Sequence, residues 1–281
     1  MAWPILAVIT VVTASVATLY QRLIMKEKDS DPVATALAFQ LILTIVIGIY
    51  ALTQGFHLPP FGAYPLQFII SSLGYGVGTL LMFQAFQYLE ASEVTIIFSV
   101  ESIIAVIGSV LVLGESFSLI EVVGTVLVLA SVFLVNARTK WKLNQGVWYT
   151  FAWAFCYGVA LISDRIILRT YDVPSYVTVI SFLPAIVIVA LRPKAIAGLR
   201  RFGRLSLLKT MMVMGIIYGI QAITYYTAVL AGAGISRMTV ITRSSIILTV
   251  ILGIIFLAER KHLWLKLSAA VLVTVGVLLL R

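Results

Sequence analysis

Charged residues are scarce in this sequence. Only 11% of its 281 residues are Asp, Glu, Lys or Arg, whereas 61% are hydrophobic, and the mean hydropathy is +1.09. Soluble domains carry about 25% charged residues, so the composition indicates a membrane protein with short polar connections. Because each membrane span takes about 20 residues, the length leaves no room for a separate water-soluble domain.

Residues that build metal sites, disulfides and nucleotide sites are also nearly absent. The single cysteine, Cys156, lies in an apolar stretch, which excludes a disulfide framework and a clustered-thiol metal site. His57 and His262 are isolated in separate connections, so we expect no metal and no cofactor. No Gly-rich, lysine-containing phosphate loop occurs, which argues against direct drive by ATP.

What the sequence has instead is a succession of apolar runs separated by polar breaks, which predicts ten membrane helices. The expected spans are 3–25, 33–53, 66–88, 92–113, 118–136, 146–168, 174–192, 206–230, 235–257 and 263–280. Pro32 and Pro174 begin two of them, since proline suits the first turn of a helix but not its interior. The predicted fold is an all-α integral membrane protein.

Parts of the sequence occur twice. Segment 113–115 (Leu-Gly-Glu) recurs at 257–259 (Leu-Ala-Glu), 144 positions later (259 minus 115), and 21–24 (Gln-Arg-Leu-Ile) is echoed at 164–167 (Asp-Arg-Ile-Ile). The repeat predicts two homologous halves of five helices each. Because five is odd, the second half is inverted, and we expect a pseudo-two-fold axis in the membrane plane, as in many secondary transporters.

The boundary between the repeats is expected near residue 140, giving a first repeat 1–140 and a second repeat 141–281. Basic residues then predict the orientation. The odd-numbered connections carry 15 Lys and Arg residues and the even-numbered side carries 3. Since basic residues stay in the cytoplasm, both termini are expected outside. The net charge of +9 is thus attributed to orientation, and no nucleic-acid partner is expected.

Several motifs together resemble one transporter family. Segment 113–117 (Leu-Gly-Glu-Ser-Phe), its counterpart 257–260 (Leu-Ala-Glu-Arg) and the passage 83–92 (Phe-Gln-Ala-Phe-Gln-Tyr-Leu-Glu-Ala-Ser) are similar to EamA-type members of the drug/metabolite transporter superfamily. The resemblance implies a ten-helix transporter with a central cavity between its halves, moving small metabolites. The family's usual basic N-terminal start is missing here, in agreement with the orientation above.

Ionisable residues inside spans are costly and are functional candidates by default. The fourth predicted span holds Glu93 and Glu101, and the ninth, its repeat mate, holds Arg237 and Arg243. We expect the pseudo-two-fold to bring Glu101 and Arg243 together at mid-membrane, where they would bind a zwitterion such as an amino acid. The alternative is a structural ion pair that joins the halves.

Amides and aromatics provide further candidates for the cavity wall, namely Gln84, Tyr157 and Gln221. Packing roles are expected for the Gly-x-x-x-Gly motifs at 74–78 and 215–219.

Three acidic residues are expected to act locally. Glu115 and Glu259 are expected to cap the helices they precede, and Asp164 to pair with Arg165 near the surface.

The sequence therefore predicts a secondary transporter of a charged or zwitterionic metabolite that works by alternating access. Its partners would be a small-molecule substrate, the lipid bilayer and a coupled proton or counter-substrate, and it would act as a monomer or homodimer in a bacterial or archaeal cell membrane. An exporter of drug-like solutes is the alternative within the same family. An intramembrane enzyme is disfavoured because the sequence contains neither a convincing nucleophile with a base nor an HExxH motif. A channel is disfavoured because it would not need inverted halves.

Overall fold

The chain folds into a bundle of helices. The computed structural model describes residues 3–27, 30–58, 61–113, 118–136, 144–168, 170–233, 238, 241–259 and 262–279, and no strand occurs among them. The long helices are α1 (Trp3–Met25), α2 (Pro32–Thr53), α3 (Pro65–Tyr88), α4 (Ala91–Phe98), α5 (Val100–Leu113), α6 (Leu119–Asn136), α7 (Gln145–Ile167), α8 (Val173–Leu191), α10 (Leu205–Ala228), α12 (Ser245–Phe256) and α13 (Leu263–Leu279). Shorter turns are η1 (Phe61–Ala63), α9 (Ala195–Gly198), η2 (Leu199–Gly203) and the π-helical η3 (Val229–Ala233).

Seven described helical segments are long and apolar enough to cross a membrane, with α4 and α5 forming one of them, Ala91–Val112. Three shorter apolar helices, Leu119–Leu134, Ile241–Phe256 and Leu263–Leu279, fall within the predicted fifth, ninth and tenth spans. Large apolar side chains are exposed all along these helices, including Leu111 and Trp264 at about four-fifths of their surface. An apolar outer surface is what a bilayer solvates, so the prediction of an all-α membrane protein is confirmed.

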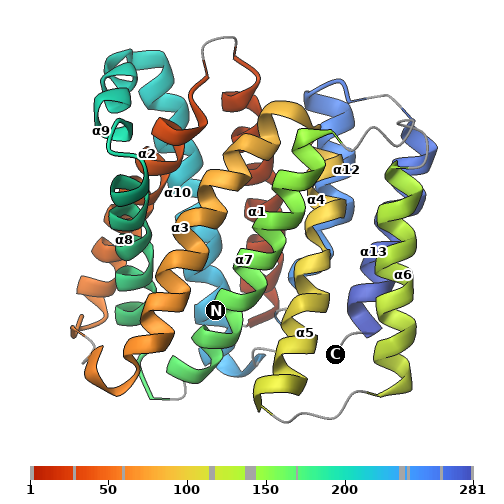
Figure 1. Cartoon of the computed structure of the whole chain (residues 1–281), viewed down its shortest axis with the longest axis horizontal. Coiled ribbons are helices and arrows are strands. Elements are labelled where there is room, and N and C mark those ends of the chain that lie inside the picture. Colours follow the sequence, from red (N-terminus) through yellow and green to blue (C-terminus); the bar gives the residue numbers. More distant parts are fainter. Residues whose placement is uncertain are drawn as a thin grey trace.

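Most helix–helix contacts occur twice, once between one pair of helices and once between their counterparts in the other half. In Figure 1, α3 lies along α7 and α1 lies along α10, and these two contacts correspond when the first and second halves are interchanged. The same exchange relates α5–α7 to α1–α12, and α3–α8 to α2–α10. The remaining large contacts, α2–α8 and α6–α13, each join a helix to its own counterpart and lie at opposite ends of the long axis. This is the pattern of a pseudo-two-fold.

Glycines permit the closest of these approaches. A Cβ at Gly74 would lie 2.7 Å from the Cys156 carbonyl oxygen of α7, and one at Gly78 would lie 2.6 Å from the Tyr157 ring. On the other side, Gly215 and Gly219 face side chains of α2 at 2.3 and 2.4 Å. Such distances are too short for any larger residue, so the expected packing role of both motifs is confirmed.

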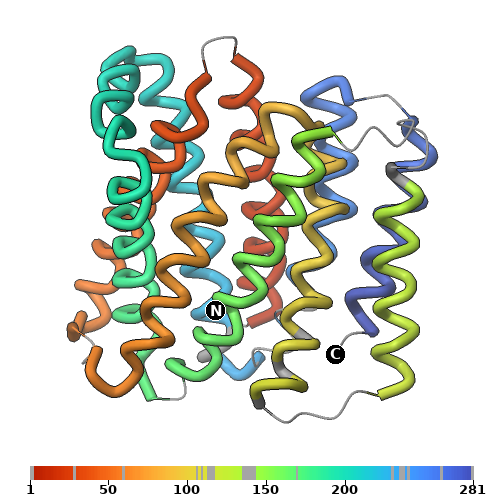
Figure 2. The backbone as a smooth tube through the Cα atoms, in the orientation of Figure 1, coloured from red at the N-terminus to blue at the C-terminus, as the bar shows by residue number. Residues whose placement is uncertain are grey.

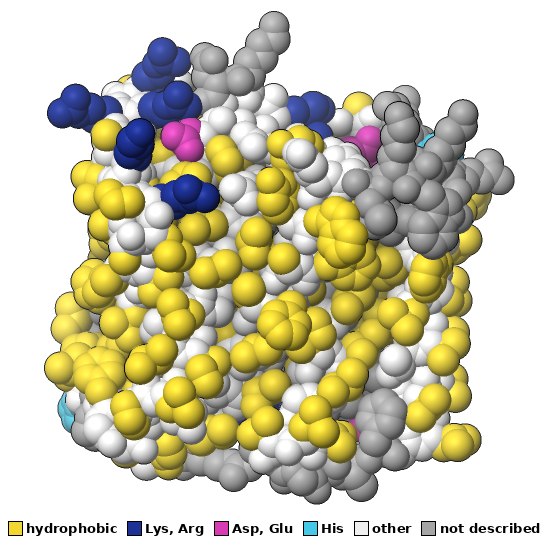
Figure 3. Space-filling model, viewed as in Figure 1, with side chains coloured by type: hydrophobic (Ala, Val, Ile, Leu, Met, Phe, Trp, Pro, Cys, Tyr) yellow, Lys and Arg dark blue, Asp and Glu magenta, His cyan; other side chains and the backbone are white. Residues whose placement is uncertain are grey.

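Basic side chains gather at one end of the molecule. Figure 3 shows Lys and Arg over α9 and η2, above a broad apolar belt, and this connection holds Lys194, Arg200, Arg201 and Arg204. We call this end the basic end; it also includes the start of α4 and the connection between α12 and α13, as the tube in Figure 2 shows. The connection 192–204, predicted as a loop, contains the short turns α9 and η2. The chain termini lie toward the opposite end.

Candidate functional site

Two helices are interrupted at positions of the repeat that agree to within one residue, since Ser99 corresponds to Arg243 at the spacing of 144. Ser99 separates α4 from α5, and Ser244 separates the helical turn 241–243 from α12. The Ser99 amide and hydroxyl both donate to the Ile96 carbonyl, at 3.2 and 2.5 Å, and those of Ser244 donate to the Ile241 carbonyl, at 3.0 and 2.6 Å. A serine hydroxyl that bonds a carbonyl one turn back competes with the regular helical ladder. Both interruptions therefore have the same local hydrogen bonds, and both serines keep helical φ and ψ angles.

The predicted charge pair lies directly beside these interruptions. Glu101 follows the first by two residues, and Arg243 immediately precedes the second. The Arg243 Nη2 atom donates to Glu101 Oε2 at 2.5 Å, with the glutamate side chain 3% exposed and the arginine side chain 19% exposed. The structure therefore brings these two residues together across the two halves, as the repeat predicts. Their role toward a substrate remains a prediction.

An aromatic wall adjoins the ion pair. Phe98, one turn before Glu101, stacks on Trp153 of α7 with ring centroids 3.9 Å apart and an interplanar angle of 21°. Tyr157 meets both rings edge-on, at 5.9 Å from Phe98 and 5.6 Å from Trp153. A Cβ on Gly158 would lie 3.2 Å from the Glu101 carbonyl oxygen, so α5 and α7 pack directly at this level. Aromatic faces and a charged pair thus share one region, called the central site below.

Polar groups from α2 and α3 reach the same wall. Gln40 Nε2 donates to Thr79 Oγ1 at 2.8 Å, and Thr79 Oγ1 shares a hydrogen bond of 3.1 Å with the Tyr157 hydroxyl. The Trp153 indole nitrogen is buried, and its polar neighbour in the central site is the Tyr157 hydroxyl. Gln40 and Thr79 were not predicted as site residues, although their polar character inside apolar spans is a signal in the sequence.

A second set of polar contacts joins the halves at the basic end. Glu259, which precedes α13, is 4% exposed and accepts from the Ala91 amide at 2.8 Å and from the Ser92 amide and hydroxyl at 3.2 and 2.8 Å. The prediction that Glu259 caps its own following helix is therefore wrong, because it caps the start of α4 in the other half. Lys266 of α13 forms an ion pair with Glu90 beside it. We call these contacts the end clamp.

A third polar cluster lies among α3, α7 and α8. Asp164 is only 5% exposed, and its Oδ1 accepts from the hydroxyls of Ser71 at 2.8 Å and Tyr176 at 2.5 Å. Its Oδ2 accepts from the Tyr75 hydroxyl at 2.5 Å. The prediction that Asp164 pairs with Arg165 near the surface is wrong, because its carboxylate is enclosed by hydroxyl groups from two neighbouring helices. We call this arrangement the hydroxyl cage.

Comparison with known proteins identifies the architecture. The model of the EamA-like transporter family matches residues 1–137 and matches again over residues 144–281. This chain belongs to the EamA-like transporter family. Its two-repeat architecture and its assignment to the drug/metabolite transporter superfamily are thereby confirmed, and the family indicates a transporter and not an enzyme.

Solved structures with the same fold exist. One, described only as "Crystal structure of protein", shares 16% sequence identity with this EamA-like transporter over 97% of this chain and 94% of that chain, with a TM-score of 0.63. At that identity the likeness shows the fold alone. No match is found among curated proteins. The family therefore establishes a multi-pass membrane transporter with a small-molecule substrate, and the substrate has to be inferred from the site.

The other predicted site residues occupy different places in the EamA-like fold. Gln84 on α3 and Gln221 on α10 are both half-buried. Arg237, and Glu115 with its predicted cap, lie outside the described residues.

Glu93 belongs to the basic end. It lies in the first turn of α4, and its Oε2 accepts from the Glu90 amide at 3.1 Å. Eight residues separate it from Glu101 (101 minus 93), which is about 12 Å along a helix. Glu93 therefore makes a local capping contact next to the end clamp. Of the two glutamates, only Glu101 contacts Arg243.

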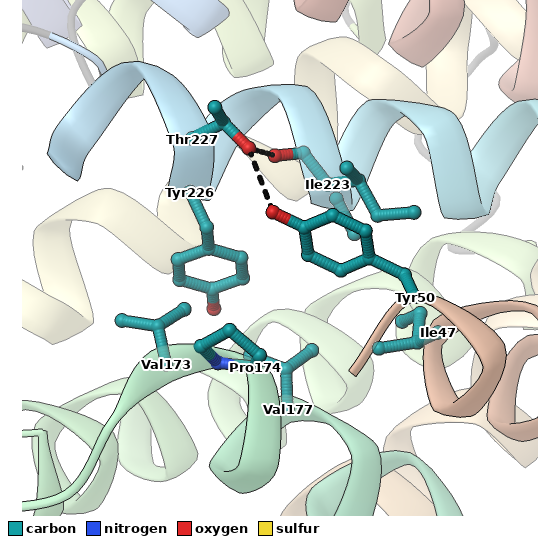
Figure 4. Close-up of a pocket in the computed structure, with 9 residues that line it drawn as sticks. Ile47, Tyr50, Val173, Pro174, Val177, Ile223, Tyr226 and Thr227 are labelled. Atoms are coloured by element: carbon teal, nitrogen blue, oxygen red, sulfur yellow. Dashed lines mark hydrogen bonds between the residues drawn. The ribbon is translucent and has the colours of Figure 1, made fainter. Parts of the chain in front are cut away.

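A small pocket opens between α2, α8 and α10 (Figure 4). It is lined by apolar side chains together with Tyr50, Tyr226 and Thr227, and the Tyr50 hydroxyl shares a hydrogen bond of 3.2 Å with Thr227 Oγ1. In Figure 4 the Tyr226 ring points toward Val173 and Pro174 at the start of α8. None of the predicted substrate residues lines this pocket, which makes it a feature separate from the central site.

Proposed function

We propose that this transporter carries a small zwitterionic metabolite, of the amino acid type, by alternating access. The observation that carries the proposal is the Arg243–Glu101 ion pair between two interrupted helices of opposite halves. Secondary transporters with inverted repeats commonly bind substrate near the membrane midplane, at the repeat interface and beside discontinuous helices.

The chemistry of the pair suggests the substrate class. The guanidinium of Arg243 offers a planar fork of donors that matches a carboxylate, and the carboxylate of Glu101 matches an ammonium group. In the empty carrier the two side chains satisfy each other. A zwitterion replaces each partner with a group of the same charge, so neither buried charge is left without a counter-charge when the pair opens.

The uncharged part of the substrate has its own surface. The Phe98–Trp153 stack and Tyr157 provide aromatic faces, and the Tyr157 hydroxyl beside the Trp153 indole adds a polar group. A compound with a carboxylate, an ammonium group and a compact apolar side chain uses all of these features together.

Thermal stabilisation of the purified full-length protein tests the substrate class. We expect amino acids to raise the midpoint of unfolding, because a ligand at 100 times its Kd stabilises the folded state by about 2.7 kcal/mol. The matching amines without a carboxylate, and acids without an amine, should raise it less. Glu101→Gln and Arg243→Gln should abolish the effect, whereas Glu121→Gln, at the start of α6, should keep it. Equal stabilisation of all three variants would refute the assignment.

Counter-flow in proteoliposomes tests the mechanism. A carrier loaded with an unlabelled stabilising amino acid accumulates the labelled compound transiently, and a channel does not. We also propose that the basic end faces the cytoplasm. A cysteine replacing the exposed Ile196 of α9 should then react with a membrane-impermeant reagent only after the membrane is opened, and reaction in intact cells would reverse the orientation.

A further inference from the structure

The hydroxyl cage holds the one described buried carboxylate that faces only hydroxyl donors. Asp164 accepts from Ser71, Tyr75 and Tyr176, and neither of the two ion pairs found among the described residues includes it. Distances of 2.5–2.7 Å between hydroxyl and carboxylate oxygens are typical of charge-assisted bonds. The two tyrosine contacts, both at 2.5 Å, therefore fit an ionised carboxylate.

The cage is not part of the repeated scaffold. The first half has Gln21, a neutral amide, at the position that echoes Asp164. In helix α10, the counterpart of α3, the same spacing of 143 residues places Met214 where α3 has Ser71, and Tyr218 where α3 has Tyr75. A contact needed only to build a five-helix repeat would be expected in both halves. This one occurs once, which points to a role in function.

The cage is physically connected to the central site. Tyr75, whose hydroxyl donates to Asp164 Oδ2, packs edge-on against Tyr157 with ring centroids 4.8 Å apart and an interplanar angle of 79°. Tyr157 in turn contacts Trp153 and Phe98. Close packing of α3 on α7 at Gly74 keeps this row of side chains in contact, so a change at Asp164 reaches the aromatic wall through a single tyrosine.

We propose that Asp164 is a proton-binding site and that Tyr75 transmits its protonation to the central site. Hydronium from the solvent transfers a proton to the carboxylate: one O–H bond of hydronium breaks, one O–H bond forms on Asp164, and a water molecule is left. If the proton resides on Oδ2, that oxygen becomes a donor, and the Tyr75 hydroxyl must then accept from it or turn away. Acceptance needs only a rotation of the hydroxyl hydrogen, whereas turning away moves the ring that packs against Tyr157; in the proposed mechanism Tyr75 turns away.

The other titratable groups around Asp164 are tyrosines. Tyr75 faces it from α3 and Tyr176 from α8, and Tyr226 of α10 lies within electrostatic range. Tyr226 also lines the pocket of Figure 4. On its own helix the next residue is Arg165, which has contacts of its own. A neutral, hydroxyl-rich surrounding leaves the carboxylate free to exist in either protonation state, unlike Glu101 with its arginine.

Proton binding can be measured without any substrate. A pH-indicator dye in weakly buffered detergent solution counts the protons taken up by the purified full-length protein during acid titration. The proton uptake of the wild type minus that of Asp164→Asn, plotted against falling pH, should rise by one proton per chain. A flat difference over the pH range in which both proteins stay folded would overturn the proposal, because a purely structural Asp164 keeps one protonation state.

Transmission to the central site has a separate readout. The fluorescence difference between wild type and Trp153→Phe should show a step at the same pH as the proton uptake. That step should vanish in Asp164→Asn and persist in the control Glu121→Gln, whose carboxylate caps the start of α6 through the Ser118 amide. Tyr75→Phe should keep the proton and lose the step. Proton uptake with no fluorescence step in the wild type would refute the link through Tyr75.

Should Asp164→Asn fail to fold, Tyr176→Phe gives an independent test. It removes one donor to the ionised carboxylate, so the fluorescence step should move to higher pH, and an unmoved step would count against Asp164. The coupling of this proton to transport rests on the proposed carrier function, but its binding does not. If the substrate is not a zwitterion, the titration result for Asp164 still holds. If the titration is flat, the proposed carrier function still holds.

Discussion

The central site and the end clamp both join the first half of the chain to the second, yet they satisfy their charges in different ways. At the end clamp, the Glu259 carboxylate accepts three hydrogen bonds, all from Ala91 and Ser92. At the central site, the described contacts of Glu101 are Arg243 and a 3.3 Å bond from the Ser102 hydroxyl. A charge held by backbone amides has partners that cannot be exchanged for a ligand. A charge held by another side chain has a partner that a ligand can replace.

The difference suggests a division of labour. Backbone amides at a helix start are fixed donors, so the Glu259 contacts hold the start of α4 in place, although the Lys266–Glu90 pair of the same end clamp joins two side chains. The arginine fork can be shared among several acceptors, which suits recognition. Three substitutions test this comparison, and they are given from the largest expected effect to the smallest.

The largest effect is expected for Arg243→Ala. Removing one partner of a buried charge pair costs about 2–5 kcal/mol in binding, which corresponds to a roughly 30-fold or greater loss of transport. The counter-flow assay measures it. The variant also leaves Glu101 buried without its cation, which lowers stability by about 3–5 kcal/mol. Adding Glu101→Ala should restore part of the stability and none of the transport. Normal counter-flow in correctly inserted Arg243→Ala would remove this residue from the site.

A smaller effect is expected for Glu259→Gln. The amide retains one acceptor oxygen and loses the negative charge that faces the start of α4. Loss of a helix cap costs about 0.5–2 kcal/mol. Amides in the first turn of α4 should exchange with deuterium faster by roughly 2-fold to 30-fold, as mass spectrometry of peptides covering 89–98 would measure. Binding of a stabilising zwitterion should persist, because the central pair is intact. Unchanged exchange at α4 would show that the end clamp does not hold this helix.

The smallest effect is expected for Ser92→Ala, which removes one hydroxyl donor from the same carboxylate and leaves both amides in place. Both backbone amides keep their carboxylate acceptor and the negative charge stays at the start of α4, so exchange in the first turn of α4 should rise less than in Glu259→Gln. Combining the two changes should add little, because both act on one carboxylate. Full additivity would indicate that Ser92 and Glu259 stabilise α4 through separate contacts.

The sequence predicted the helices well, for a physical reason. A helix in lipid satisfies its own backbone groups, so apolar runs and proline starts carry the information locally. The interruption at Ser99 was not predicted, since a single serine inside a span usually bonds back without interrupting a helix. The turns α9 and η2 were missed because a short basic connection gives no periodicity long enough to recognise.

Contacts between helices were predictable only where the repeat supplied geometry. Glu101 and Arg243 were expected to meet because symmetry relates their helices. Glu259 was predicted to cap the helix that follows it in the sequence. Its carboxylate instead accepts hydrogen bonds from amides of α4, which is distant in the sequence. Asp164 was placed near the surface for a similar reason. The hydroxyls that enclose it come from α3 and α8, and their register against α7 follows from packing at Gly74, which a single sequence does not display.

The interruption at Ser99 has a consequence for the order of events in a transport cycle. The end clamp grips α4, whereas Glu101 resides on α5, beyond the interruption. An uninterrupted, rigid span would force the start of α4 and Glu101 to move together. A bend at Ser99 would let α4 leave Glu259 while α5 keeps Glu101 against Arg243. Under the proposed carrier mechanism, opening at the basic end is then separable from release of the substrate.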